Sequence, residues 1–165
     1  MRPTRARRPF YIGGELGWNG LSGLGVNFGY HPHPHFAIDA GAGLSLTGWR
    51  ASFRLRGNLL KGEWTPFVGA GLSIASGTGG EEIELESKGE KAKLEVLVSP
   101  FVQVAGGVNY TGTEGFVFTA TSGYSILTRK GGNTRQISGS VDTYEDVKPI
   151  YGGGLIISVM FGYAF

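Results

Sequence analysis

The sequence lacks cysteine and has no long hydrophobic run. Without cysteine, neither a disulfide framework nor a thiolate metal site can form. Its apolar residues never approach the roughly 18 consecutive positions that a membrane-spanning helix requires. Thirty glycines also argue against helices, because glycine destabilises helix interiors. The chain is therefore expected to consist of short strands.

Bulky apolar residues alternate with small or polar residues along most of the chain. In the last segment, Phe161, Tyr163 and Phe165 share one face of an extended strand, and smaller residues share the other. Apolar residues recur at every second position, a pattern that we call strand parity, until a turn interrupts it. This pattern predicts eight strands, of which the sixth begins at Val96 and the eighth at Tyr151. A chain of 165 residues suffices for eight strands of roughly 10 to 12 residues, but not for sixteen.

The two faces of these strands differ in side-chain volume. One face is rich in glycine, alanine, serine and threonine, which suits the narrow interior of an eight-stranded barrel, whereas the apolar face is too bulky for it. The sequence thus predicts an all-β, eight-stranded antiparallel up-and-down transmembrane β-barrel over residues 10–165, with its apolar face in lipid. A soluble lipocalin-like barrel with reversed faces is the alternative. Aromatic girdles at the two membrane interfaces are predicted at Trp18, Tyr30, Trp49, Trp64, Tyr110, Tyr151 and Tyr163.

Residues 64–72 (WTPFVGAGL) and the C-terminal FGYAF resemble the small outer-membrane barrel domains of the OmpA and OmpX type. The resemblance implies a location in the bacterial outer membrane of a Gram-negative cell envelope. It also implies that Phe161, Tyr163 and Phe165 form an assembly signal, which the barrel assembly machinery reads. Outer-membrane lipids, lipopolysaccharide and an envelope protein are the expected partners. Adhesins, anchors and lipid-modifying enzymes share this architecture, so the fold does not select an activity.

The lengths of the connections orient the chain. Three short turns, among them His31 to His35, lie at one end of the predicted barrel, and long excursions at 75–95 and 128–148 lie at the other. Outer-membrane barrels have short periplasmic turns and longer external loops, so both termini are expected to be periplasmic. At Asn19-Gly20, strand parity requires a loop with an odd number of residues, and we predict three. Gly20 or Gly23 is expected to take a left-handed or bulged conformation there.

Residues 1–9 are predicted to be a basic, flexible N-terminal arm. They contain four of the fifteen cationic residues, and without them the net charge changes from +2 to −2. The body of the protein is therefore not expected to bind nucleic acid. The arm lacks the apolar stretch of a signal peptide, and we expect an export signal to have been removed.

A polar network is predicted in the lumen. If Thr47-Gly48 is a two-residue turn, Asp39 lies opposite Arg56, and Arg54 faces a glycine. Together with Glu15 and Arg50, these side chains give three arginines and two acids in a confined space, where charges must be paired or solvated. The network is either a gate or anion path, or a structural polar core that fills the lumen.

The segment 81–95 is predicted to form a projecting extracellular hairpin. A turn at Lys88-Gly89 would pair oppositely charged residues on one face and apolar residues on the other. The hairpin residues are Ile83, Glu84, Leu85, Glu86, Lys91 and Lys93, of which Ile83 and Leu85 are candidate contacts. The hairpin is either a binding edge or a solvated continuation of the sheet.

No residue pattern indicates catalysis. The three histidines at His31, His33 and His35 alternate with prolines, which splay the rings, so a rigid polar turn is favoured over a metal site. We predict no metal, no cofactor and no enzymatic activity. The sequence favours a structural or interaction protein that works through the loops 75–95 and 128–148 or through the arm. A narrow pore and a lipid-modifying barrel enzyme are the alternatives.

Overall fold

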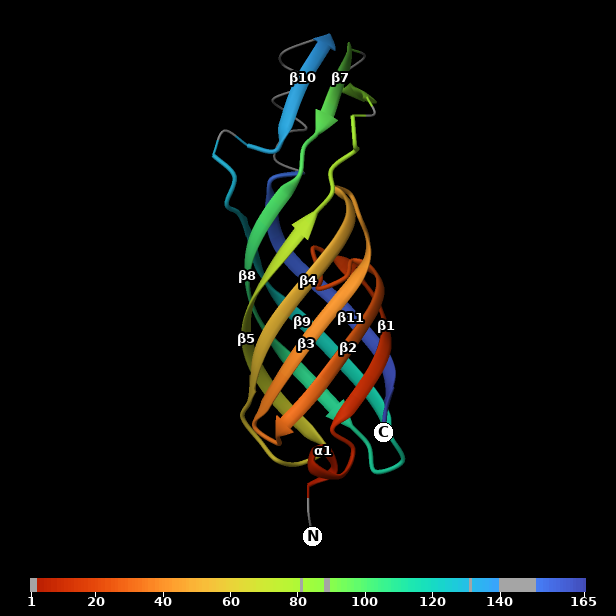
Figure 1. Cartoon of the computed structure of the whole chain (residues 1–165), viewed down its shortest axis with the longest axis vertical. Helices are drawn as coiled ribbons and strands as arrows, with labels where there is room; N and C mark the ends of the chain where they lie inside the picture. The colour runs from red at the N-terminus through yellow and green to blue at the C-terminus, as the bar shows by residue number, and fades with distance from the viewer. Residues whose placement is uncertain (1–2, 81, 88–89, 131, 140–150) are drawn as a thin grey trace.

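The computed structural model describes residues 3–80, 82–87, 90–130, 132–139 and 151–165. Eight of its strands form a closed barrel in the order β1-β11-β9-β8-β5-β4-β3-β2, and all neighbours are antiparallel (Figure 1). These strands are β1 (Phe10–Trp18), β2 (Leu24–His33), β3 (Phe36–Ser45), β4 (Gly48–Asn58), β5 (Trp64–Ala75), β8 (Ser99–Thr111), β9 (Phe116–Leu127) and β11 (Gly153–Ala164). The predicted eight-stranded antiparallel barrel is confirmed.

Further elements lie beyond each end of the barrel. The short helix α1 (Thr4–Arg7) precedes β1. Strands β6 (Ile83–Ser87), β7 (Glu90–Val96) and β10 (Thr134–Gly139) form a separate sheet in the order β10-β7-β6. Figure 1 places α1 and both chain termini at one end, which we call the terminal end, and the small sheet at the opposite loop end.

Within the described residues, no helix is long and apolar enough to cross a membrane.

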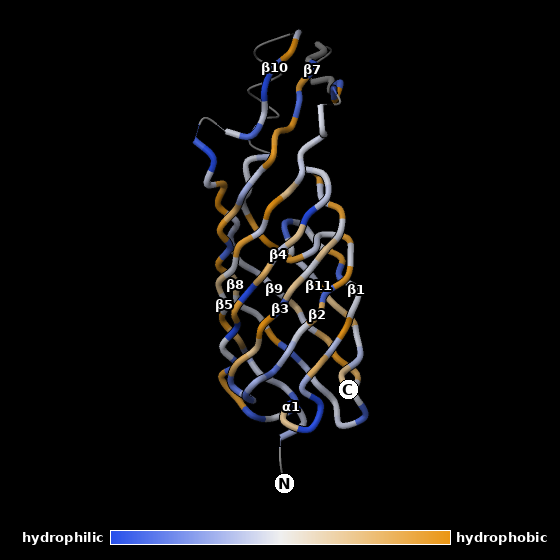
Figure 2. Tube along the Cα trace, in the orientation of Figure 1, coloured by the Kyte–Doolittle hydropathy of each residue, from blue (hydrophilic) through white to orange (hydrophobic). Residues whose placement is uncertain are grey.

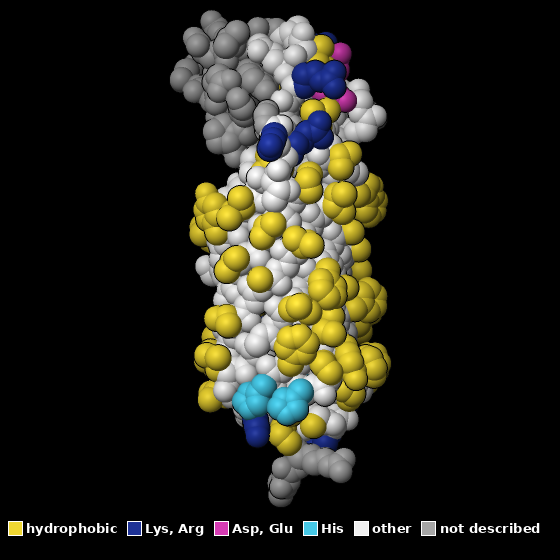
Figure 3. Space-filling view, turned by 60° about the vertical axis from the view of Figure 1, so that its left-hand side comes forward, with side chains coloured by type: hydrophobic (Ala, Val, Ile, Leu, Met, Phe, Trp, Pro, Cys, Tyr) yellow, Lys and Arg dark blue, Asp and Glu magenta, His cyan; other side chains and the backbone are white. Residues whose placement is uncertain are grey.

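The barrel wall has an apolar outside. Along β1, exposed and buried side chains alternate, and Phe10, Leu16 and Trp18 point outward. The same alternation of apolar and polar positions recurs along the other barrel strands (Figure 2). In the space-filling view, hydrophobic side chains cover the wall, whereas cationic side chains gather near its two ends (Figure 3). The predicted assignment of the two faces is confirmed.

The inside of the barrel is filled with side chains. Tyr11, Val117, Met160 and Ala164 form a buried apolar cluster. Many other inward positions are polar and buried, among them Glu15, Asn27, Asp39, Arg50, Ser52, Arg54, Arg56, Asn58, Thr65, Ser73, Gln103, Asn109, Thr119, Thr121, Ser125 and Ser158. A lumen of this composition is a packed polar core.

Two predicted strand starts were wrong. Strand β8 begins at Ser99 and β11 at Gly153, so Val96 and Tyr151 are not part of the barrel wall. Both instead pack with Leu94 in the buried cluster of the small sheet, with Ile83 against it. Because an amphipathic strand looks the same in either sheet, its alternation alone could not assign these residues. Tyr151 is therefore not a girdle residue.

Aromatic rings line the outside near the terminal end. Trp64 contacts Tyr110 with their ring centroids 4.8 Å apart, and Phe10 stacks on Tyr30 at 4.7 Å. At the loop end, Trp18 and Trp49 are exposed. This distribution is typical of aromatic girdles at two lipid–water interfaces.

The turn between β3 and β4 differs from the prediction. Ser45 pairs with Gly48, so the two turn residues are 46 and 47 rather than Thr47-Gly48. The Ser45 hydroxyl donates to the Gly48 carbonyl at 3.0 Å and accepts from the Thr47 amide at 3.3 Å. Gly48 has φ +90°, which favours glycine there. These local interactions move the register by two residues while keeping the same faces inward.

The loop between β1 and β2 folds into the barrel mouth. The number of loop residues is odd, as predicted, because Leu16 pairs with Leu24. The loop has five residues, 19–23, rather than the predicted three. Gly23 takes the predicted left-handed conformation with φ +74°. We call residues 19–23 the inward loop, since Leu21 and the residue after it are fully buried.

Candidate functional site

Asp39 is the centre of a charged network in the part of the lumen nearer the terminal end. Its side chain is fully buried, and its Oδ1 accepts a hydrogen bond from the Tyr11 hydroxyl at 2.6 Å. Arg54 donates to Asp39 Oδ2 from Nε at 3.2 Å and from Nη2 at 3.1 Å. Arg56 Nη2 lies 3.4 Å from Asp39 Oδ1. One carboxylate thus serves two arginines and a tyrosine.

The strand register around this network needs a correction. Asp39 lies directly opposite Arg54, and Arg56 faces Ala37, whereas the sequence had placed Asp39 opposite Arg56. The cause is the two-residue shift at the β3–β4 turn. Because diagonal neighbours on one face remain within reach of long side chains, Asp39 still pairs with Arg56.

Two buried aromatic rings complete the surroundings of the arginines. The guanidinium groups of Arg54 and Arg56 lie 5.5 Å and 5.0 Å from the ring centroid of Phe67. Arg50 lies 5.1 Å from that of Phe101. Cation–π contacts of this kind stabilise a guanidinium in a place where water is excluded.

Tyr11 reaches Asp39 because β2 carries a glycine beside it. A Cβ atom on Gly29 would overlap the Tyr11 ring. The ring therefore lies against the backbone of Gly29, which is directly opposite Tyr11 in the β1–β2 pairing. A residue with a side chain at this position would displace the tyrosine hydroxyl from the carboxylate.

Glu15 holds the inward loop at the loop end. Its Oε1 accepts from the Leu21 amide at 3.1 Å, and its Oε2 accepts from the Ser22 amide at 2.6 Å and hydroxyl at 2.8 Å. Asn27 donates to the same oxygen at 3.0 Å. All of these donors are neutral, and within the described residues no hydrogen bond or ion pair joins Glu15 to Arg50. The carboxylate therefore anchors the loop and is not part of the Asp39 network.

Arg50 meets the inward loop from the other side of the mouth. Its Nη1 donates to the Gly20 carbonyl at 3.3 Å, and its Nη2 lies 3.5 Å from Asn19 Oδ1. Gln103 donates to the Asn19 carbonyl at 2.9 Å. These contacts close the lumen at the loop end.

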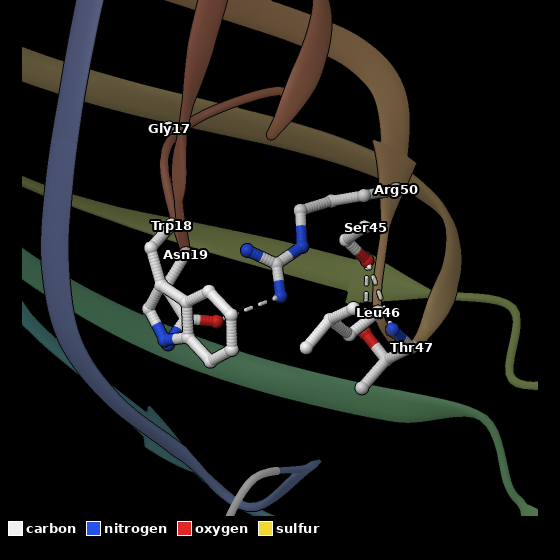
Figure 4. Close-up of a pocket in the computed structure, with 7 residues that line it drawn as sticks. All are labelled: Gly17, Trp18, Asn19, Ser45, Leu46, Thr47 and Arg50. Carbon is white, nitrogen blue, oxygen red and sulfur yellow. Dashed lines mark hydrogen bonds between the residues drawn. The ribbon is translucent and has the colours of Figure 1, made fainter.

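A small cavity of about 40 Å³ lies beside Arg50. Figure 4 shows the guanidinium between Trp18 and Asn19 on one side and Leu46 and Thr47 on the other. The cavity is lined by Gly17, Trp18, Asn19, Ser45, Leu46, Thr47 and Arg50.

The terminal end is closed by the N-terminal segment, contrary to the predicted flexible arm. Arg5 on α1 is 1% exposed, and its guanidinium donates to the carbonyls of Gly62 at 2.7 Å and Glu63 at 2.9 Å. It also donates to Asn109 Oδ1 at 3.3 Å. Burial, with a smaller effect of the nearby Arg56 charge, lowers the pKa of Arg5 to about 10, so it remains cationic at neutral pH. Residues 3–8 thus cap the barrel.

A second arginine ties the same segment to the last strand. Arg8 donates to the Ala164 carbonyl at 2.9 Å and to the Thr113 carbonyl at 3.2 Å. Neither Arg5 nor Arg8 was a predicted site residue. A four-residue helix carries no detectable periodicity, and its partners are carbonyl groups of distant turns, so the sequence gives no signal of this cap.

The three histidines do not share one turn. His33, the last residue of β2, and His35 lie at the terminal-end turn with their ring centroids 5.6 Å apart, while His31 lies further inside β2 and is 4% exposed in the lumen beside Tyr11. His31 continues the inward-facing alternation of β2, and the register of this strand shifts only after Tyr30. Among the residues that the structure describes, no group of three potential metal ligands lies together.

The hairpin of β6 and β7 has the predicted register, with Ile83 opposite Leu94 and Glu84 opposite Lys93. Lys93 pairs with Glu82 at 3.2 Å, and both side chains are exposed. The side chains of Leu85, Glu86 and Lys91 lie outside the described part of the structure, as do the turn 88–89 and residues 140–148 of the last long loop.

The C-terminal strand closes the barrel against the first. Phe165 donates its amide to the Phe10 carbonyl at 2.8 Å, and Phe10 donates back at 3.2 Å. The side chains of Phe161, Tyr163 and Phe165 all point outward and are more than half exposed. Their role as an assembly signal stays a prediction.

Comparison with known proteins supports the architecture. No family model matches the chain, and no curated protein matches it. The crystal structure of the N-terminal β-barrel domain of Pseudomonas aeruginosa OprF is similar, with a TM-score of 0.54 over 94% of this chain and 95% of that chain. The chain has the OprF barrel fold. At 15% sequence identity this likeness concerns the fold alone. It confirms the resemblance to small barrels of the OmpA type at that level.

The OprF-like barrel fold does not by itself assign a role to the lumen. That role has to come from this chain's own residues, among which Tyr11, Arg5 and the inward loop were not predicted. Tyr11 has the same strand parity as Glu15, so its inward direction could have been read from the sequence. Its contact with Asp39 could not, because it depends on the β1–β2 and β2–β3 registers together.

Proposed function

We propose that the chain is a closed barrel of the bacterial outer membrane, which works as a structural or interaction protein and does not conduct ions. The apolar wall with aromatic rings toward both ends supports a location in lipid. The short turns at the terminal end and the small sheet at the loop end support periplasmic termini and an external sheet.

The observation that carries this proposal is the closure of the lumen at three levels. Arg5 caps the terminal end, the Asp39 network fills the lumen next to this cap, and the inward loop with Arg50 covers the loop end. Each closure is held by hydrogen bonds between buried groups, which are costly to leave unsatisfied. An ion would have to break all three in succession.

A narrow pore is the second candidate, and one observation favours it. Within the described residues, four buried arginines, Arg5, Arg50, Arg54 and Arg56, accompany two buried carboxylates. This excess of positive charge would favour anions if the lumen opened. A lipid-modifying enzyme has no comparable support, because His31 is enclosed in the lumen away from lipid.

Conductance across a planar lipid bilayer tests the proposal. We expect the wild-type chain to give no stable current steps under conditions in which a wide porin conducts. Flotation of the chain with lipid vesicles would establish that it has inserted. Reproducible steps with anion selectivity would contradict the closed barrel and support the narrow pore.

Lipopolysaccharide, the barrel assembly machinery and an envelope protein remain proposed partners. The small sheet of β6, β7 and β10 is the surface best suited to an external partner, because it extends past the apolar wall (Figure 1). Its own buried cluster of Leu94, Val96 and Tyr151 supports a preformed surface.

A further inference from the structure

Arg50 is a buried cation whose charge and hydrogen-bond donors are only partly matched by partners. Its side chain is 2% exposed, and its Nε has no hydrogen-bond partner. Its two hydrogen bonds, to the inward loop, are long at 3.3 Å and 3.5 Å, and the Phe101 ring, its other contact, is uncharged. A buried charge without a close counter-charge costs much free energy, so such a group usually has an anionic partner.

Neither carboxylate of the lumen forms a direct ion pair with Arg50 in the described part of the chain. Asp39 is shared by Arg54 and Arg56 through ion pairs at 3.1 Å and 3.4 Å. The charge of Glu15 acts on Arg50 electrostatically, but Glu15 accepts four hydrogen bonds from neutral donors and forms no ion pair with Arg50 within the described residues. Arg50 thus differs from the other two arginines of β4, which bind Asp39 directly.

The cavity beside Arg50 has the size for a small anion and a buried cation in its lining. At about 40 Å³, it has room for roughly three water-sized spheres, since each needs about 10 to 15 Å³. Ser45 and Thr47 also line it with hydroxyl groups that lie 3.0 Å apart, and the Ser45 hydroxyl donates to the Gly48 carbonyl. The cavity is too small for a sugar phosphate but large enough for a halide ion.

We propose that this cavity is a binding site for a small monovalent anion of halide size, with Arg50 as its counter-charge. The anion would neutralise Arg50 between the inward loop and the β3–β4 turn, and thereby hold the loop end of the barrel closed. This binding site does not require the barrel to conduct ions, because an anion bound at the closed loop end need not pass through the lumen.

Thermal unfolding of the detergent-solubilised chain tests the site. We compare sodium bromide with sodium gluconate at equal ionic strength, since gluconate is too large for the cavity. Bromide at about tenfold its dissociation constant should raise the wild-type Tm by about 3 to 6 °C relative to gluconate. The Arg50→Gln variant should lose this difference.

The matched control is Arg129→Gln, which removes an exposed arginine at the same end of the barrel. It should keep the bromide effect, whereas a general salt effect on the protein would persist in both variants. An equal Tm in both salts for the wild type, or an unchanged difference in Arg50→Gln, would overturn the proposal.

A crystallographic measurement covers the case in which Arg50→Gln does not fold. Wild-type crystals soaked in bromide should show an anomalous peak in the cavity beside Arg50. Ordered water without an anomalous peak at saturating bromide would overturn the proposal.

Discussion

Replacing Asp39 with alanine should lower the free energy of unfolding by about 3 to 5 kcal/mol, because it leaves two arginines buried without their shared carboxylate. Arg54 and Arg56 both pair with Asp39, and the Tyr11 hydroxyl would lose its acceptor as well. Urea unfolding of the chain from lipid vesicles would measure the change.

Ser73→Ala is the matched control for this substitution. Ser73 is also buried in the lumen, but its hydroxyl has no hydrogen-bond partner in the structure, so its removal should cost much less. If Asp39→Ala costs no more than Ser73→Ala, water fills the lumen and solvates the arginines, and the packed polar core is refuted.

The second large effect is expected on the outer wall. Val68 lies near the middle of β5 and is 60% exposed on the apolar face. Arginine at such a position, near the bilayer midplane, should cost about 2 to 4 kcal/mol of stability in lipid. The same urea titration from vesicles measures it.

Glu114→Arg provides the comparison, because Glu114 is exposed in the turn before β9 and outside the apolar wall. It should change stability little, since surface substitutions away from special features have small effects. Equal stabilities for Val68→Arg and Glu114→Arg would mean that the wall around Val68 does not contact hydrocarbon.

The sequence predicts the barrel and its two faces well, for a physical reason. Side chains alternate with a period of two along any strand, so Phe161, Tyr163 and Phe165 must share a face whatever the neighbouring strands do. The hairpin register of β6 and β7 was equally accessible, because a short loop and complementary charges such as Glu84 and Lys93 determine it locally.

The candidate site was less predictable because it depends on turn geometry and on contacts far apart in the sequence. A two-residue change at the β3–β4 turn preserves the inward face but exchanges the partner opposite Asp39. Arg5 and Arg50 both donate to backbone carbonyl groups in loops that are distant in the sequence. Every residue has such a carbonyl group. No residue pattern could single out these contacts.

The central claim is that the apolar wall faces lipid and the polar side chains face inward. Circular dichroism of the denatured chain diluted into buffer, with and without lipid vesicles, tests it most directly. The structure predicts stable β-sheet and protease protection of the barrel only when vesicles are present. A chain that folds to a stable, soluble monomer in lipid-free and detergent-free buffer would contradict the claim.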